Sequence, residues 1–253
     1  MYGADSYSLQ ARTVGTAPAP DWTDVSCIPS STSCSVTVPM GTTQYSFRVM
    51  GKNSVTGTQS AWANAAIFLS EAINDGYVIK TGTNYSAKPN DTPPGIRAGE
   101  GSGMPLPHWR GILSSNTGAL SSVATAVLGA KLRLHQATSG SNFSPANPCV
   151  VDVEKGSFGG NAGLAGTDYY QSDLYTTTVA FNIVNTPASV NNGWFEMVFP
   201  QSLATAYVGI TASPNDHTQF RIYFQSPLAA GHNEGWDSGE STVSPPQLIV
   251  QYQ

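Results

Sequence analysis

The stretch VVDVEKGSFGG, residues 150–160, has the alternation of a strand that is buried on one face. Successive side chains of a strand point to opposite faces, so Val151 and Val153 would share one face and Asp152 and Glu154 the other. Two carboxylates at positions i and i+2 lie roughly 6–7 Å apart, close to the separation used in glycoside cleavage. The stretch therefore predicts a β-strand and raises two hypotheses: a catalytic carboxylate pair and a purely structural strand.

The residues around these carboxylates favour the structural hypothesis. Acid–base catalysis needs one carboxyl group that stays protonated and one that stays ionised. Lys155 follows Glu154 directly and would hold a neighbouring carboxylate in its ionised form. Gly156 permits a turn or bulge at the end of the strand. The alternative, Asp152 and Glu154 as catalytic residues, stays open at this point.

Two arginines occur inside apolar strands, Arg110 in HWRGILS and Arg221 in TQFRIYF. A charge in such a position needs a partner, and Asp152 or Asp75 would provide one. The simple interpretation is a buried Arg–Asp pair, which would consume the carboxylate that catalysis requires. The functional alternative is an arginine that binds the carboxylate of a uronate through a bidentate contact.

Composition points to an all-β protein that does not bind nucleic acid. Of the 253 residues only 11% are charged, and there are 25 Gly and 17 Pro. Strand-forming and turn-forming residues dominate over helix formers. The formal net charge is −5 and the Lys and Arg residues are scattered, which argues against a nucleic-acid partner. No apolar run reaches the roughly 18–20 residues that a membrane span needs.

Cysteine placement suggests an exported protein. Cys27 and Cys34 bracket the loop CIPSSTSC, and a local disulfide there is expected in an oxidising compartment, with two free thiols as the alternative. The N-terminus MYGADSYSLQ lacks the basic and apolar regions of a signal peptide. We therefore expect a secreted, extracellular location for a chain that is a piece of a longer protein.

Strand signals divide the chain into two parts, residues 1–70 and 71–253. The first has short alternating strands starting at Tyr7, Cys34 and Gln44. The second has eight strands and no amphipathic helix of three turns, which favours a β-sandwich or jelly roll. QSLAT after Pro200 is expected to make one helical turn at most. The eight strands begin at Asp75, Trp109, Thr125, Cys149, Gly193, Ala206, Thr218 and Pro246.

The first part resembles a fibronectin type III domain over residues 4–68. ADSYSLQAR is similar to the third strand of that family, and TTQYSFRVMGKNSVTGTQSAWANA to its last two strands and closing turn. The resemblance implies that Tyr45, Phe47 and Val49 face a core that Trp62 closes. Because the family's first two strands have no counterpart, we expect a small, incomplete sandwich with an edge that another segment must cover.

Residues 75–252 resemble the DNRLRE, or disaggregatase-related, domain. The phrases DGYV, HWRGILS, LGAKLRL, VVDVEKGSFGG, GLAGTDY, TQFRIYF and SGESTVSPPQLIVQY occur in the order expected of that family. The resemblance implies a β-jelly roll from an extracellular bacterial or archaeal protein, similar to carbohydrate-binding modules, some of them assigned to alginate and related polysaccharides. The segment QSPLAAGHNEGWDSGE departs from the family's Asp-rich loop.

Loop aromatic residues are the predicted sugar-binding residues, because rings can lie flat against pyranose faces and loops carry binding residues disproportionately. Trp236, flanked by Glu234 and Asp237, ranks first; packing beneath its own loop is the alternative for each ring. The full predicted set is Tyr85, His108, Trp109, Tyr169, Tyr170 and Trp236.

A structural calcium ion is the expected cofactor, if there is one, because loop carbonyls and carboxylates suit its coordination. The predicted ligands are Asp75, Asp91 and Asp168, with Asn90 and Asp173 as further candidates. No EF-hand spacing, GxSxG motif or nucleotide-binding loop occurs in the sequence.

The leading hypothesis is a non-catalytic polysaccharide-binding or adhesion module of a secreted bacterial protein, which contacts polysaccharide and the neighbouring domains of a longer parent chain. The first alternative is a polysaccharide-cleaving enzyme, either a glycoside hydrolase or a lyase. The second is a structural spacer of a surface protein. A β-sandwich is compatible with all three.

Overall fold

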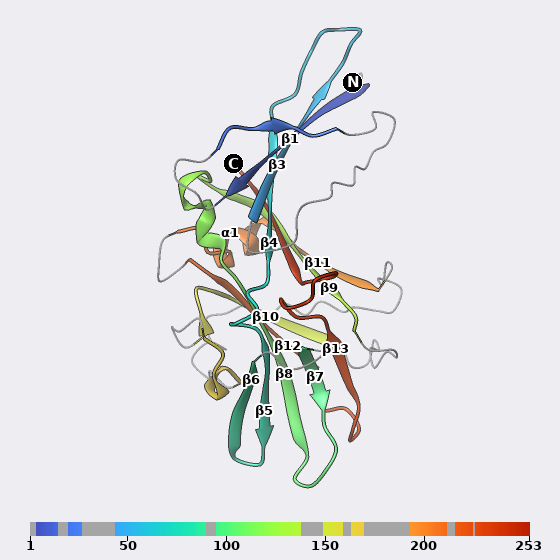
Figure 1. The fold of residues 1–253 in the computed structure, drawn as a ribbon, viewed down its shortest axis with the longest axis vertical. Helices are drawn as coiled ribbons and strands as arrows, with labels where there is room; N and C mark the ends of the chain where they lie inside the picture. The colour runs from blue at the N-terminus through green and yellow to red at the C-terminus, as the bar shows by residue number, and fades with distance from the viewer. Residues whose placement is uncertain are drawn as a thin grey trace.

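The computed structural model describes residues 4–14, 20–26, 44–89, 95–137, 149–158, 163–169, 193–211, 216–224 and 226–253. Within them the chain is an all-β protein with two antiparallel sheets packed as a sandwich (Figure 1), as predicted. The predicted disulfide cysteines, Cys27 and Cys34, and the strand expected from Cys34 lie outside the described residues. No helix of the described residues is long and apolar enough to cross a membrane.

Within the described residues, sheet A contains seven strands, which come from the N-terminal, middle and C-terminal parts of the chain. Their spatial order is β11 (Trp194–Phe199), β9 (Val127–His135), β14 (Gln247–Tyr252), β4 (Ala63–Leu69), β3 (Gln44–Lys52), β1 (Ser6–Val14) and β2 (Thr23–Asp24).

Sheet B lies at the lower end of the molecule in Figure 1, and β1 and β3 extend to the opposite end. Its order is β10 (Cys149–Lys155), β12 (Thr218–Phe224), β8 (Pro107–Ser115), β5 (Gly76–Thr81) and β6 (Asn84–Pro89). A further strand, β7 (Ile96–Glu100), pairs with both β8 and β13 (Asn233–Trp236).

The main core lies between the two sheets and follows strand alternation. Val151 and Val153 of β10 are buried in it, together with Phe220 and Ile222 of β12. Asp152 and Glu154 therefore lie on the outer face of sheet B, as the alternation predicts. A smaller cluster covers part of that outer face and contains Val78, Ile112, Phe158 and Tyr169, with Ala87 and Leu164 packed against it.

Sheet A runs across the predicted domain boundary at residue 70. β4 pairs with β3 on one side and with β14 on the other, from Asn64 opposite Tyr252 to Leu69 opposite Gln247. The hydroxyl groups of Ser46 and Tyr252 lie 2.6 Å apart in this buried region. The last strand therefore covers one edge of the N-terminal strands, and the described part of residues 1–70 shares sheet A with the rest of the chain. Strand patterns report local alternation only, so they could not reveal this long-range pairing.

The buried face of β3 is the opposite of the predicted one. Ser46 is completely buried, whereas Val49 is 38% exposed and Tyr45 and Phe47 are half-buried. The reason is the continuity with β14: the Ser46 face continues the inner face of sheet A, so it carries the contact with Tyr252.

Two further expectations differ from the structure. The strand expected from Ala206 is absent; instead α1 (Gln201–Tyr207) extends past the single turn predicted after Pro200. The strands β6, β7 and β13 were not predicted, because NYSAKP, IRAGE and NEGW lack an apolar alternation. The short 3-10 helices η1 (Thr117–Ser122) and η3 (Gly166–Tyr169) complete the described elements.

Candidate functional site

Asp152 forms a buried ion pair with Arg221, which lies directly opposite it on the neighbouring strand. Nε and Nη2 of Arg221 donate to Oδ2 of Asp152 at 2.9 and 2.6 Å, and both side chains are nearly inaccessible to solvent. Nη1 of Arg221 donates to the main-chain oxygen of Asp168 at 3.0 Å, and the guanidinium lies 5.0 Å from the Phe158 ring centroid. The predicted Arg–Asp pair is therefore present, and it binds η3 to the outer face of sheet B.

Asp152 is held by contacts within the fold rather than left free to act with Glu154 as a catalytic pair. One oxygen of Asp152 is bound to Arg221, and the other accepts a hydrogen bond of 3.3 Å from the Tyr223 hydroxyl. Glu154 is half-buried, and desolvation raises its pKa while Arg221 lowers it. The structural interpretation of this strand therefore accounts for Asp152 without any catalytic step.

Arg110 lies between two tyrosine rings instead of pairing with Asp152 or Asp75. Its Cζ is 4.3 Å from the ring centroid of Tyr169 and 4.4 Å from that of Tyr223. Its Nη1 donates to the main-chain oxygen of Tyr169 at 3.0 Å. A guanidinium held against aromatic faces keeps its orientation, because its planar form stacks well there.

Tyr85 extends this group of rings toward solvent. It is 42% exposed, and its ring centroid lies 5.5 Å from that of Tyr169, which is 5% exposed. Lys80, opposite Tyr85 on β5, has its ammonium 6.0 Å from the Tyr85 ring centroid. A Cβ atom on Gly166 would lie 3.1 Å from the main chain of Tyr85, so glycine allows η3 to pack this closely on β6.

We call Lys80, Tyr85, Arg110, Tyr169 and Tyr223 the Arg110 cluster. Four of its members project from strands of sheet B and the fifth from η3, so rigid elements position the side chains. Burial raises the pKa of the Tyr169 hydroxyl, while Arg110 lowers it. The cluster combines an exposed ring with two cationic side chains. Such a surface can bind a flat apolar face and an oxyanion together.

Of the other predicted sugar-binding residues, His108 shares the outer face of sheet B with the cluster, directly opposite Lys80 on β5. Nδ1 of His108 lies 2.5 Å from Oε2 of the buried Glu100. Trp109, on the opposite face of β8 from Arg110, is half-buried with its centroid 5.7 Å from that of Tyr77. Tyr170 lies outside the described residues.

Trp236 is a core residue and corrects the expectation of an exposed loop ring. It is 1% exposed, because β13 pairs with β7 and turns the ring into the main core opposite Ile96. The flanking carboxylates are also engaged, Glu234 with Gln136 at 2.9 Å and Asp237 with Nδ1 of His135 at 2.8 Å. The residue ranked first from sequence is therefore not available as a binding platform.

The predicted calcium ligands are separate within the described residues. Asp75 is fully buried and accepts a hydrogen bond from the Gly239 amide at 2.7 Å; burial raises its pKa to about 7. Asp168 accepts from the Ala165 amide at 2.7 Å, and burial raises its pKa to about 6. Asp91, Asn90 and Asp173 are not among the described residues. In that part of the chain, no three His, Cys, Asp or Glu side chains gather in a way that could hold a metal ion.

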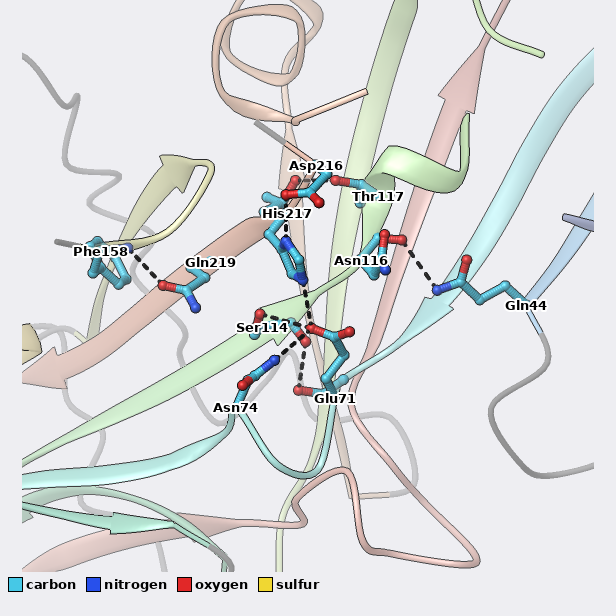
Figure 2. A network of polar contacts seen from close by, with 12 residues as sticks. Gln44, Glu71, Asn74, Ser114, Asn116, Thr117, Phe158, Asp216, His217 and Gln219 are labelled. Carbon is cyan, nitrogen blue, oxygen red and sulfur yellow. Dashed lines mark hydrogen bonds and ion pairs between the residues drawn. The ribbon is translucent and has the colours of Figure 1, made fainter. Parts of the chain in front are cut away.

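A histidine between two carboxylates is the main polar feature that sequence reasoning missed (Figure 2). Nδ1 of His217 lies 2.8 Å from Asp216, and Nε2 lies 3.1 Å from Glu71. Glu71 also accepts hydrogen bonds from Asn74 at 3.0 Å and from Ser114 at 3.2 Å. The Asp216–His217 neighbourhood is visible in the sequence, but the contact with Glu71 joins residues far apart along the chain.

This network is suited to fixing the ends of strands rather than to catalysis. The two carboxylates raise the pKa of His217 to about 9, so the imidazole is a cation near neutral pH and cannot act as a general base. The pKa of Glu71 is lowered by His217, Asn74 and Ser114 against the effect of burial. Ser114 donates to Glu71 and not to His217, so the arrangement differs from a nucleophile–histidine–carboxylate triad.

Comparison with protein-family models and with curated proteins gives no match to this chain. No protein-family model matches it, and no curated protein matches it significantly. The inference about function therefore depends on the geometry of the chain's own residues.

Proposed function

We propose that the chain is a polysaccharide-binding module of a secreted, modular bacterial protein and that the Arg110 cluster contacts the sugar. The observation that carries the proposal is the exposed Tyr85 ring leaning on Tyr169, with Arg110 held between Tyr169 and Tyr223 on the same face of sheet B. The resemblance of residues 75–252 to carbohydrate-binding domains supports the bacterial and extracellular parts of the proposal.

Each member of the cluster has a separate contribution to binding. The Tyr85 ring offers an apolar face for the CH groups of a pyranose, while guanidinium and ammonium groups donate to hydroxyl or carboxylate oxygens. Tyr169 and Tyr223 hold Arg110 in place, so little side-chain entropy is lost when the sugar binds. Binding by a rigid surface of this kind requires no chemical step.

The enzyme alternative has less support. Asp152 is bound to Arg221, and His217 is a cation between Asp216 and Glu71. The two other histidine–carboxylate contacts of the described residues, His108 with Glu100 and His135 with Asp237, include no serine or cysteine. A binding module accounts for the Arg110 cluster without assigning a nucleophile.

The test measures binding and cleavage together. The protein is run through gels that contain a panel of neutral and acidic polysaccharides, and the same polymers are assayed for new reducing ends and for unsaturated products. We expect retardation without products. Released products would favour a hydrolase or a lyase, and a lack of retardation on every polymer would favour a spacer.

A pair of tyrosine substitutions locates the site. Tyr85→Ala is expected to weaken retardation by about tenfold in apparent affinity, because the ring face is lost. Tyr7→Ala is the matched control, since Tyr7 is 52% exposed on sheet A and is not part of the cluster. Equal retardation of the Tyr85→Ala variant and the unchanged protein would remove the Arg110 cluster from the proposal.

A further inference from the structure

Four side chains near β1 and β3 of sheet A form an alternating stack of guanidinium and indole groups. Cζ of Arg12 lies 4.3 Å from the ring centroid of Trp22, and Cζ of Arg48 lies 4.5 Å from the same ring. Arg48 is also 4.3 Å from the ring centroid of Trp62. We call Arg12, Trp22, Arg48 and Trp62 the Arg–Trp stack.

The stack lies on the extension of the inner face of sheet A. The β1–β3 register places Arg12 opposite Ser46 and Gln10 opposite Arg48, so the stack shares its face with the buried Ser46. β1 and β3 extend away from the end of the molecule that holds β5 to β8 (Figure 1). Farther along this face, Phe68 and Leu248 belong to the apolar core, whereas here the face carries half-buried guanidinium groups.

The two guanidinium groups have no carboxylate counter-ion within the described part of the chain. No described carboxylate oxygen lies within 4.0 Å of a nitrogen of either arginine, although the exposed Asp21 and Asp24 flank Trp22. Asp24 instead accepts from the Gln10 amide at 2.8 Å, and the Gln10 oxygen accepts from Nε of Arg48 at 2.7 Å.

Within the ranges that the structure describes, Arg12 has fewer hydrogen-bond acceptors for its guanidinium group than Arg48 has. Its Nε is buried and has no hydrogen-bond acceptor among the described residues. Desolvating a charged donor without a partner is costly, and a bound anion would offset that cost. Stacking on Trp22 covers the guanidinium face and Nε is buried, so an oxyanion would contact the two terminal nitrogens, whose spacing suits a bidentate contact.

We propose that the Arg–Trp stack is an anion-binding site that makes the chain select acidic polysaccharides. This inference rests on the proposed polysaccharide-binding function and adds to it a second contact surface, distant from the Arg110 cluster. Carboxylate or sulfate groups along the polymer bind Arg12 and Arg48. An extended peptide that adds a strand here would have to pair with the two-residue edge strand β2, because β3 is paired on both sides.

The experiment compares three polymers on the full chain: a neutral glucan, a polyuronate and a sulfated glycan. Affinity electrophoresis at low and at high salt gives apparent affinities. We expect the two acidic polymers to bind at least about tenfold tighter than the glucan at low salt, with the difference shrinking at high salt. The absence of any such preference overturns the proposal, whether or not the glucan is retained.

Substitutions assign the preference to the stack. Arg12→Gln and Arg48→Gln are each expected to lower acidic-polymer affinity about tenfold and to leave glucan affinity unchanged. Lys155→Gln, which removes the same charge from sheet B, is the matched control and should leave the preference intact. Tyr85→Ala is expected to lower the affinity for every polymer, so its effect tests the proposed function. The arginine variants are expected to lower the affinity for acidic polymers only, so their effect tests the Arg–Trp stack.

A second variant covers the case in which the glutamine variants lose structure. Arg48→Lys keeps the charge but loses planar stacking and bidentate geometry, and its fold is checked by near-ultraviolet circular dichroism of the tryptophans. A folded Arg48→Lys variant with reduced acidic-polymer affinity supports the proposal; full affinity overturns it. Displacement of the polymer by an acidic peptide as effectively as by free polyuronate would overturn the assignment to a glycan.

Discussion

Arg221 and Asp152 face each other across β12 and β10, and the arginine binds with two nitrogens to a single carboxylate oxygen. The same guanidinium reaches the main-chain oxygen of Asp168, so one side chain joins two strands and η3. Because η3 also carries Tyr169, the Arg221–Asp152 pair helps to fix the position of a member of the Arg110 cluster. The pair thus connects the fold of the sandwich with the candidate site.

Breaking the pair is expected to be strongly destabilising. Asp152→Asn leaves the Arg221 guanidinium buried without a counter-ion, which should lower the free energy of unfolding by about 3–5 kcal/mol. Urea unfolding measures the loss. Glu154→Gln, two residues along the strand, is the control and should change stability by less than about 0.5 kcal/mol. An Asp152→Asn variant as stable as the control would mean that the pair contributes little.

Replacing both partners gives a sharper measurement of the pair. Asp152→Leu combined with Arg221→Met removes both charges, and we expect the double variant to be more stable than Asp152→Asn alone. The Asp168 oxygen loses a donor in this variant, so recovery should be partial.

Sequence patterns located the strands that have apolar alternation, and they predicted that Asp152 pairs with a buried arginine, either Arg110 or Arg221. They did so because alternation and a charge within an apolar strand are local signals. The pairing of β4 with β14 is not local: residues 63–69 and 247–252 become neighbours only after folding. For the same reason the patterns missed the contact between Glu71 and His217.

In the candidate site too, local sequence signals identified residue types but not the long-range pairings that bury or expose them. Tyr85 and Tyr169 were identified as loop aromatics, and the structure brings their rings to 5.5 Å, although Tyr85 lies on a strand. Trp236 belongs to the same class of residue but is buried, since its four-residue strand pairs with β7. Composition cannot distinguish an exposed ring from a buried one when the pairing strand has no apolar alternation of its own.

The His217 network predicts a loss of stability at alkaline pH. The folded pKa is about 9 and the ordinary value is 6.5, so the stabilisation is complete below pH 6.5 and disappears as pH rises through 9. The lowered pKa of Glu71 adds a loss only in acid. In the unchanged protein the free energy of unfolding falls as the pH becomes alkaline. We expect His217→Gln to make that fall smaller by on the order of 1–2 kcal/mol, a value that allows for solvent screening of this partly exposed group.

Urea unfolding at pH 6 and pH 9 measures that decrease for each protein. His232→Gln removes an exposed histidine before β13 and should leave the alkaline decrease as large as in the unchanged protein. An equal decrease in the His217→Gln variant would show that the imidazole gains nothing from Glu71 and Asp216.

Asp75 predicts a loss of stability between weak acid and neutral pH. Burial, with the nearby charges of Glu240 and Glu71, raises its pKa from 3.8 to about 7. The folded chain therefore keeps a proton that the unfolded chain has released, so stability falls as pH rises from about 4 to 7. Asp75→Asn should reduce the difference in unfolding free energy between pH 4 and pH 8 by on the order of 3 kcal/mol.

The unfolding free energies at the two pH values are compared within one variant, so any pH-independent loss of stability caused by the asparagine cancels. Asp237→Asn is a control on a half-buried carboxyl that accepts from His135. If the free energy of unfolding of the Asp75→Asn variant changes between pH 4 and pH 8 as much as that of the unchanged protein, the proton is not held at Asp75.

The pairing of β4 with β14 predicts that the N-terminal strands fold only with the rest of the chain. β4 is hydrogen-bonded to β3 on one side and to β14 on the other. The hydroxyl groups of Ser46 on β3 and Tyr252 on β14 meet in this buried region. A fragment of residues 1–70 would leave Ala66 and Phe68, both completely buried in the full chain, without the strand and the core that cover them. We expect amide hydrogen exchange in the fragment at the rate of an unfolded chain, whereas in the full chain the amides of β4 should exchange as slowly as those of β9. Slow exchange and a cooperative urea transition in the fragment would instead support an independent N-terminal domain, because a unit that folds alone needs neither β14 nor the core of the sandwich.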